Sequence, residues 1–320
     1  MSVAAAEPIP LYPRRRLIGS PFGGFTSLRR GEGSDIASSR PYEPGDHVST
    51  IDWKGSARLS AAHGQDEFIV RQRHAEEMSR VLIVVDRRPS MALYPRSLPW
   101  LNKPTAIAHA TDVLVASAIN QRALVGYLDF ASHSNAHHAG TPFWQRPRAQ
   151  LGVWHGELRE RFAEHLEGGF DAPENTLELA LTFLTTSVRG ILPVGTFVFV
   201  LSDFTTPLQT ASWARALEHG WDLVPVVIQD PTWEQSFPSI HGVLMPLADA
   251  TNRTRRLVRL TARQADERQK ANESRLRALL SDFAGLGLDT ALIGRGDPVH
   301  VHAALLRWAE GRLELRGRLA

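Results

Sequence analysis

One apolar run that ends in a carboxylate constrains the fold of this chain more than any other feature. Residues 81–85 read Val-Leu-Ile-Val-Val, and Asp86 follows directly. Five consecutive aliphatic residues predict a strand that is buried on both faces, as in a parallel sheet. Arg87, Arg88 and Pro89 then break the strand pattern. In an open α/β sheet the binding crevice lies at the carboxyl ends of the strands, an edge that we call the crest. We therefore expect Asp86 at the crest; a solvated aspartate at a plain strand end is the alternative.

A second run of the same form, residues 196–201, ends in Ser202 and Asp203. Segments of strand length alternate with segments of helical periodicity along the rest of the chain, which predicts an α/β fold with a doubly wound, mostly parallel sheet. Two short extended pieces, 242–247 and 255–260, predict an antiparallel β-hairpin added to the sheet edge. The other expected strands are 123–130, 223–228 and 288–293, and the expected helices are 105–121, 150–167, 175–189, 208–219, one that opens at 261, and 299–310.

The composition argues against several classes of function. The absence of cysteine excludes disulfide scaffolds, thiolate metal sites and a cysteine nucleophile. The 36 basic residues nearly balance the 34 acidic ones, and only Lys54, Lys103 and Lys270 are lysines, which argues against a nucleic-acid partner. No apolar run approaches the roughly 18 residues of a membrane span, and the N-terminus has apolar residues before its basic cluster, the reverse of a secretory signal. We therefore expect a cytoplasmic protein without direct membrane insertion.

Neither a Gly-x-Ser-x-Gly elbow nor a phosphate-binding loop occurs, which lowers the expectation of an enzyme.

Charged and aromatic residues are dense between positions 40 and 58. The segment reads Arg-Pro-Tyr-Glu-Pro-Gly-Asp at 40–46, Ile-Asp-Trp-Lys at 51–54 and Ser-Ala-Arg at 56–58. Single residues of these types are usually solvated, but together they can form a salt-bridged cluster or a binding surface. We expect this segment to pack against the sheet domain and to bury the ring of Trp53. The motif residues are Arg40, Tyr42, Pro44, Gly45, Asp46, Asp52, Trp53, Lys54 and Arg58.

The order of these motifs, followed by a strand that ends in Asp86 and then by Ser90-Met91, resembles the bacterial family called domain of unknown function 58 (DUF58). The resemblance implies a fold like that of von Willebrand factor A domains. We divide the chain into an N-terminal extension, residues 1–78, which carries the motifs, and a von Willebrand factor A-like domain, residues 79–320. Residues 1–38 are rich in proline and glycine and read as a loop-rich arm that is either disordered in part or laid over the domain.

The resemblance also implies a metal-ion-dependent adhesion site at the crest. In von Willebrand factor A domains this site uses Asp-x-Ser-x-Ser, a threonine and a further aspartate, a set of hard oxygen ligands suited to Mg²⁺. The corresponding residues here are Asp86, Ser90, Thr176 and Asp203, but Arg88 stands where the first serine belongs. An arginine cannot ligate a cation, and its guanidinium can pair with either aspartate instead. We therefore expect a degenerate site at which Mg²⁺ binding is weak or absent.

For function, the resemblance implies a non-enzymatic protein-interaction module that works with a MoxR-type AAA+ ATPase, as an adaptor in the assembly or maturation of a client. The alternative is a hydrolase that uses a Ser/Asp site at the crest of the α/β sheet. The sequence names neither the client nor the oligomeric state.

Overall fold

The computed structural model describes residues 7–14, 25–43, 51–65, 67–77, 79–92, 101–132, 138–148, 169–248 and 255–319. Within these ranges a six-stranded sheet forms the centre of the molecule. All its neighbouring strands run parallel except β4 and β5, which are antiparallel. The prediction of an α/β fold with a mostly parallel central sheet is therefore confirmed. In spatial order the strands are β10 (Ala291–Ile293), β7 (Asp222–Ile228), β6 (Phe197–Ser202), β3 (Arg80–Val85), β4 (Leu124–Asp129) and β5 (Phe143–Arg148).

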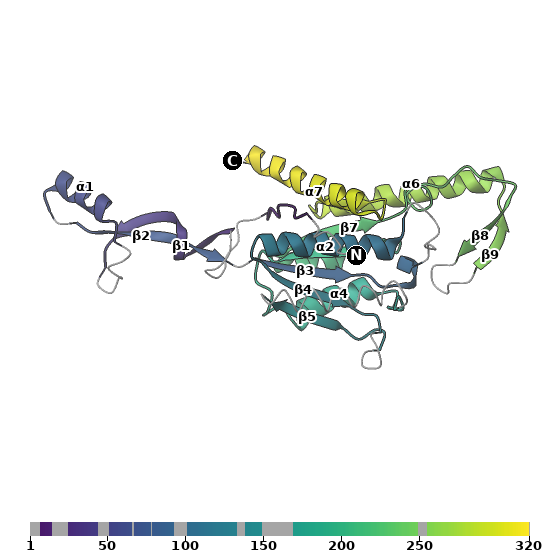
Figure 1. Cartoon of the computed structure of the whole chain (residues 1–320), viewed down its shortest axis with the longest axis horizontal. Coiled ribbons are helices and arrows are strands. Elements are labelled where there is room, and N and C mark those ends of the chain that lie inside the picture. The colour runs from purple at the N-terminus through teal and green to yellow at the C-terminus, as the bar shows by residue number, and fades with distance from the viewer. Residues whose placement is uncertain are drawn as a thin grey trace.

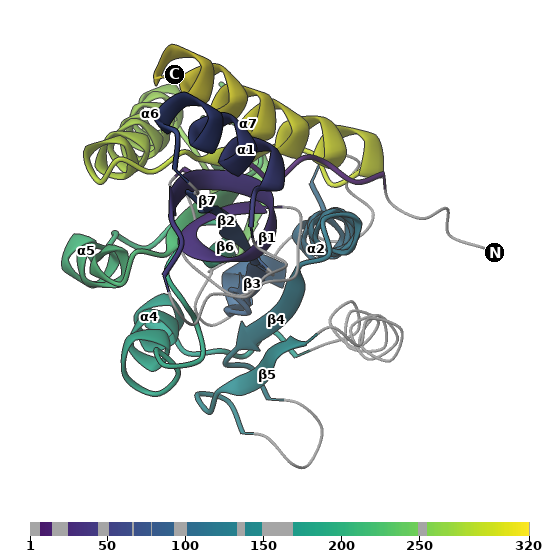
Figure 2. The ribbon, with the colours of Figure 1, turned by 90° about the vertical axis from the view of Figure 1, so that its left-hand side faces the viewer.

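Helices cover both faces of this sheet (Figure 2). Strand β3 shows why, because the side chains of its residues 81–85 alternate between two apolar cores and are at most 2% exposed. Val81, Ile83 and Val85 belong to one core, and Leu82 and Val84 to the other. The first core packs against α2 (Lys103–Asn120) and α7 (Pro298–Leu319), and the second against α4 (Thr176–Thr186), α5 (Thr210–Glu218) and α6 (Ala262–Gly285).

Helices α2, α4, α5 and α6 and the start of α7 lie within a few residues of the positions that the sequence periodicity predicts, whereas α7 runs on to Leu319 and α1 (Trp53–His63) was not predicted. The start of α6 shows the local cause: Thr261 Oγ1 accepts from the amide of Gln264 at 3.2 Å, and Gln264 Oε1 accepts from the amide of Thr261 at 2.9 Å. The predicted helix at 150–167 lies outside the described residues. None of the helices in the described ranges combines the length and the apolar character that a membrane span requires.

The two extended pieces after β7 form a hairpin, β8 (Leu244–Ala248) with β9 (Arg255–Arg259). This pair is a sheet of its own and is not hydrogen-bonded to an edge of the central sheet, so the expected position of the hairpin is wrong. The reason is a third, small core: Met245 and Val258 pack with Phe237, Leu260 and Ala265, which holds the hairpin beside the start of α6.

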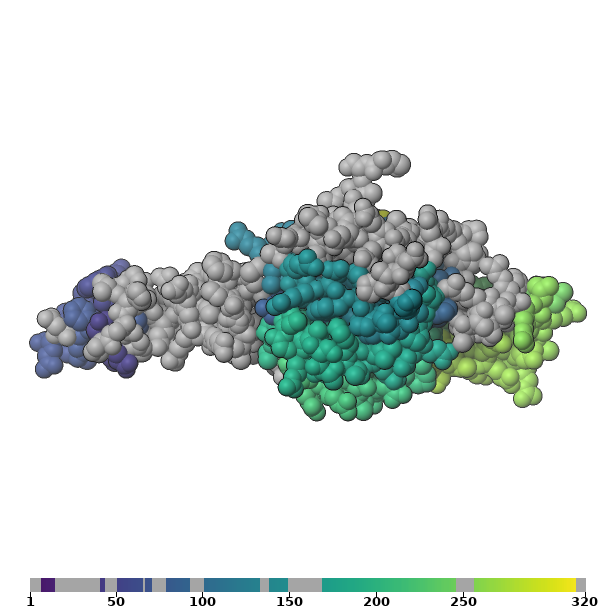
Figure 3. Space-filling model, turned by 90° about the horizontal axis from the view of Figure 1, so that it is seen from below, coloured from purple at the N-terminus to yellow at the C-terminus, as the bar shows by residue number. Residues whose placement is uncertain are grey.

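The N-terminal part of the chain forms a projection that we call the arm (Figure 1). It consists of β1 (Phe25–Pro41), α1 (Trp53–His63) and β2 (Ile69–Glu77), with β1 and β2 antiparallel. Strand β2 leads into β3, so the arm leaves the sheet at the amino ends of the strands, opposite the crest. In the space-filling view, α1 lies at one extreme of the molecule, and β9 and the first turns of α6 lie at the other (Figure 3).

The expectation that the 40–58 segment packs on the sheet domain is wrong for its described residues. Trp53 is 59% exposed, and its ring meets Phe68 of the same arm edge-on, with ring centroids 6.1 Å apart. Residues 44–50, and with them Pro44, Gly45 and Asp46, lie outside the described ranges. The sequence misled us because an aromatic residue beside charged ones suits a buried cluster and an exposed binding surface equally well.

Residues 7–14, by contrast, lie on the body of the molecule. Ile9 and Leu11 are each 1% exposed in the core shared with α2 and α7. The amide of Ile9 donates to Ser117 Oγ at 2.9 Å, and Arg312 Nη1 donates to the carbonyl of Tyr12 at 3.1 Å. This part of the N-terminus is therefore laid over the domain, one of the two alternatives that the sequence left open. For residues 25–38 the expectation of a loop is wrong, because they belong to β1 of the arm and pair with β2.

Candidate functional site

The candidate site lies where the strand order of the central sheet reverses. Numbered along the chain, the six strands lie side by side in the order 3-2-1-4-5-6, and the reversal falls between β3 and β6. Such a switch point forms a crevice at the carboxyl ends of its two strands. Asp86 directly follows β3 and Asp203 directly follows β6, so both predicted carboxylates stand at this point. Both are 0% exposed, which rules out the alternative of a solvated aspartate at a strand end.

Arg88 joins the two carboxylates. Its Nη2 atom lies 2.6 Å from Asp86 Oδ2 and 2.9 Å from Asp203 Oδ1. Its Nε donates to Asp86 Oδ2 at 2.9 Å, its backbone amide donates to Asp86 Oδ1 at 2.9 Å, and its Nη1 donates to Thr206 Oγ1. The side chain is 5% exposed, so Arg88 points into the crest and away from solvent. The guanidinium fork matches two carboxylates in the way that makes arginine pairs strong.

A second buried cation extends the network. The Nζ atom of Lys103, the first residue of α2, lies 2.9 Å from Asp203 Oδ2 and 2.5 Å from Glu234 Oε1. It also donates to the carbonyl of Ser90 at 3.2 Å, and the side chain is completely buried. Asp203 therefore binds one cation with each of its oxygens. We call the five residues Asp86, Arg88, Asp203, Lys103 and Glu234 the crest network.

The pKa values of these groups follow from burial and from the opposite charges beside them. Burial alone would raise the pKa of Asp203, but Lys103 and Arg88 outweigh it and hold that pKa well below its ordinary value. Burial lowers the pKa of Lys103, yet Asp203 and Glu234 outweigh it and raise that pKa. Burial raises the pKa of Glu234, and Lys103 offsets this only in part. The two cations and the Asp203 carboxylate are therefore charged at neutral pH.

The two predicted hydroxyl ligands occupy other positions in the site. Ser90 is buried and Thr176 is the buried first residue of α4, and within the described ranges neither hydroxyl is hydrogen-bonded to Asp86 or Asp203. Two other hydroxyls reach the carboxylates: that of Ser202 donates to Asp86 Oδ2 at 2.6 Å, and that of Thr205 donates to Asp203 Oδ1 at 3.0 Å. The hydroxyl of Thr206 contacts the crest network as the acceptor for Arg88.

These contacts test whether the residues fit a divalent cation. A metal ion would need oxygens of Asp86 and Asp203 at once, but Arg88 Nη2 already lies within hydrogen-bond distance of both carboxylates. Two unit charges about 4 Å apart repel by roughly 4 kcal/mol at an effective dielectric constant near 20. The donor set, with its guanidinium in place, does not fit Mg²⁺.

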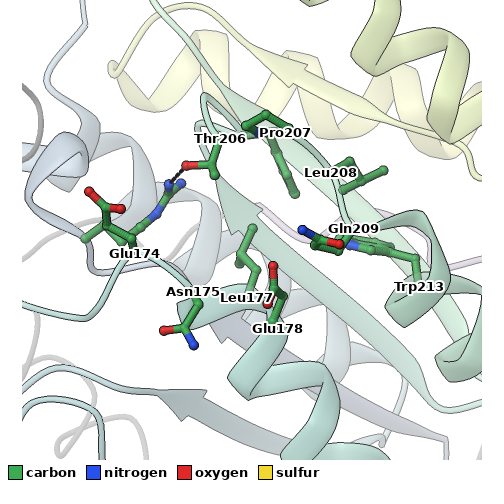
Figure 4. A pocket seen from close by; sticks show the side chains of 11 residues that line it. Glu174, Asn175, Leu177, Glu178, Thr206, Pro207, Leu208, Gln209 and Trp213 are labelled. Atoms are coloured by element: carbon green, nitrogen blue, oxygen red, sulfur yellow. Dashed lines mark hydrogen bonds between the residues drawn. The ribbon is translucent and has the colours of Figure 1, made fainter.

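A small pocket of about 30 Å³ opens beside Arg88, between the start of α4 and the loop from β6 to α5 (Figure 4). Glu174 and Glu178 stand on the α4 side, and Thr206, Pro207 and Leu208 on the loop side. Trp213, with Phe204, adds an aromatic wall. We call this feature the crest pocket; it combines two carboxylates with an apolar lining.

The remaining motif residues lie on the arm, remote from the crest. Asp52 caps α1, because its Oδ1 accepts from the amide of Gly55 at 3.0 Å. Lys54 and Arg58 are exposed on α1, and Tyr42, whose amide donates to the carbonyl of Phe68 at 2.8 Å, is 37% exposed. The backbone of Arg40 pairs with Val70 across the two strands of the arm.

Sequence reasoning missed Lys103, Glu234 and Ser202. The sequence contained one indication that Lys103 is special, because it is one of only three lysines in the chain. The sequence contained no such indication for Glu234, which lies 131 positions from its partner Lys103 and in a turn without a motif. Ser202 was noted as the residue before Asp203, but its bond to Asp86 depends on the pairing of β3 with β6.

The family described as "Protein of unknown function DUF58" matches residues 38–278. Uncharacterized protein Rv1480 of Mycobacterium tuberculosis and uncharacterized protein Mb1516 of Mycobacterium bovis are each 24% identical over 249 residues, which cover 77% of this chain and 71% of theirs. Among solved structures, the conserved hypothetical protein BatB of Bacteroides thetaiotaomicron is 15% identical with a TM-score of 0.36, over 65% of this chain and 98% of that one. An aerotolerance-related membrane protein of Bacteroides fragilis is 16% identical with a TM-score of 0.36, and the match covers 65% of this chain and 99% of that one.

Proposed function

This chain belongs to the DUF58 family of proteins of unknown function, and we propose that it is a non-enzymatic protein-interaction module of the von Willebrand factor A type. The strand order 3-2-1-4-5-6 is shared by doubly wound sheets in general and is compatible with this type, and the order of the sequence motifs is what supports it. In this proposal the crest network has replaced the metal ion of the adhesion site, and the module acts in the cytoplasm without a cofactor.

One observation carries the proposal: Arg88 lies between Asp86 and Asp203, within 2.9 Å of an oxygen of each. A metal-dependent module leaves one coordination position open for a carboxylate of its partner. Here a side chain of the protein itself fills the corresponding space, and Lys103 holds the second oxygen of Asp203. Such an arrangement fixes the loops of the crest without an ion. In this proposal the protein surface around these loops, and not a metal ion, binds the partner protein.

We propose a MoxR-type AAA+ ATPase as the partner, on the basis of the family resemblance, with the chain as an adaptor in the assembly or maturation of a client. The alternative, a hydrolase with a Ser/Asp site at the crest, has less support. A serine nucleophile needs a base within hydrogen-bond reach. Ser90 Oγ is buried without a hydrogen bond among the described residues, and Ser202 is 0% exposed and donates to Asp86.

The test is a binding titration between the purified chain and the nucleotide-free MoxR-type ATPase of the same organism, by biolayer interferometry, with EDTA and with added Mg²⁺. We expect saturable binding with the same Kd in both buffers, because no metal ion joins the two proteins in this proposal. Binding that disappears in EDTA would contradict the metal-free crest. Absence of binding in both buffers would reject this partner.

A further inference from the structure

The outer side of the β8–β9 hairpin exposes aliphatic side chains. Successive residues of a strand point to opposite sides of a sheet. Met245 and Val258, which lie opposite each other, point to the third core. Leu244 and Leu257, each next to one of them in its strand, therefore point away from that core, and they are 66% and 70% exposed. The inward apolar side anchors the hairpin, and the outward one is open to solvent.

Two further residues enlarge this apolar side. Ile240 and Val243, which precede β8, are 40% and 51% exposed. Four of the twelve large apolar side chains that are exposed in the described ranges therefore lie within residues 240–257. Such a concentration is typical of an interaction site. We call these four residues, together with the exposed Arg256 and Arg259 of β9, the hairpin face.

The hairpin face belongs to a basic segment of a nearly neutral chain. Residues 237–260 contain four arginines and one acidic residue, Asp249, a net charge of +3 with histidine neutral, whereas the whole chain carries +2. Arg268 of α6 adds an exposed cation next to the hairpin, because its guanidinium carbon lies 5.8 Å from the ring centroid of Phe237. An aliphatic centre with arginines around it suits a protein surface that has an apolar centre and an acidic rim.

The hairpin is also fixed to the crest. Glu234 of the crest network lies in the turn that leads from β7 to the hairpin, and Arg275 Nη2 donates to its carbonyl at 2.7 Å. Asn272 Nδ2 donates to the carbonyls of Trp233 and Ser236 at 3.1 and 2.6 Å. Helix α6 therefore holds this turn, and the hairpin stands at the end of the molecule opposite the arm (Figure 1). This is the end at which a partner that binds around the crest loops meets the protein.

From these observations we propose that the hairpin face is the docking surface for the partner ATPase, which presents an apolar patch with acidic side chains around it. This inference rests on the proposed function and names the surface that performs it. A membrane or a single-stranded nucleic acid suits the face less well, because sites for either typically expose aromatic residues. The exposed side chains here are aliphatic, and Phe237 is 7% exposed within the third core.

The test measures binding of hairpin variants to the nucleotide-free ATPase by biolayer interferometry. Leu244→Thr/Leu257→Thr removes the apolar centre and keeps residues that favour strands. We expect its Kd to rise at least about tenfold, the usual effect of losing an interface anchor. Arg256→Glu should lower the association rate and weaken its dependence on salt. Because all three side chains are exposed, the urea midpoints of both variants should match that of the wild type.

Matched controls make the same changes near the amino ends of the strands and on the arm. Ile119→Thr/Val194→Thr alters two aliphatic residues that are 40% and 44% exposed, near the starts of β4 and β6. Arg58→Glu reverses an exposed cation of α1. Both controls should bind the ATPase like the wild type.

Hairpin variants that bind as tightly as the wild type would overturn this inference and leave the proposed function standing. A wild type that does not bind the ATPase would reject the proposed function, and this inference with it. Sedimentation with phosphatidylglycerol vesicles tests the competing membrane surface. Vesicle binding by the wild type that is lost in Leu244→Thr/Leu257→Thr would also overturn the inference.

Discussion

Replacing Arg88 by serine perturbs the crest network most directly, because the substitution restores the Asp-x-Ser-x-Ser pattern and removes the cation together. Breaking a buried ion pair by removing one partner costs about 3–5 kcal/mol, since a buried charge is left uncompensated. We expect about 3 kcal/mol for Arg88→Ser. Asp203 keeps Lys103 at 2.9 Å, and Asp86 keeps the hydroxyl of Ser202 at 2.6 Å, so neither carboxylate is left without a donor.

The assay is urea unfolding of wild type and variant in EDTA and in Mg²⁺. The wild-type midpoint should not respond to Mg²⁺, whereas the Arg88→Ser midpoint should fall in EDTA and recover in Mg²⁺. A ligand that binds only the native state stabilises it by about 2.7 kcal/mol at one hundred times its Kd, nearly the expected loss. Arg88→Ala is the control, because it removes the same cation without adding an oxygen ligand and should recover less. An Arg88→Ser protein as stable as the wild type in EDTA would refute the reasoning.

Three further predictions address the network and the arm. Lys103→Met should lower the free energy of unfolding, measured in urea, by about 3–5 kcal/mol, because Asp203 loses its second cation and Glu234 loses the cation with which it pairs. The pKa of Asp203 lies below its ordinary value of 3.8, so its ion pairs stabilise the fold above pH 3.8 and this contribution is lost as the pH falls further. Acid unfolding curves should show this loss. The free energy of unfolding should depend less steeply on pH in Lys103→Met. Trp53→Ala should change the free energy of unfolding by less than about 1 kcal/mol, because the ring is 59% exposed; a loss of several kcal/mol by urea unfolding would show that the ring is buried in solution.

Local patterns were sufficient to predict much of the fold. Five aliphatic residues predicted strand β3, and a capping box predicted the start of α6. Both predictions were possible because each pattern involves only residues that are neighbours in the chain. The position of Asp86 and Asp203 at one edge also followed, since parallel strands bring their carboxyl ends together. Arg88 was recognised as the residue that closes the crest because it interrupts a known pattern.

Contacts between distant segments set the limit of that reasoning. Lys103 meets Asp203 across 100 positions and Glu234 across 131, and no periodicity connects such residues before the sheet is assembled. The same limit applies to the arm. Whether Trp53 is buried depends on what lies opposite α1, and neither propensity nor composition contains that information.

The central claim is that Arg88 takes the place of a metal ion at the crest, and a side-by-side titration of Mn²⁺ into metal-free wild type and Arg88→Ser tests it most directly. Calorimetry should show no saturable heat for the wild type and one-site binding for Arg88→Ser, and Asp86→Asn in the variant background should abolish that binding. Equal titration curves for wild type and Arg88→Ser would contradict the claim.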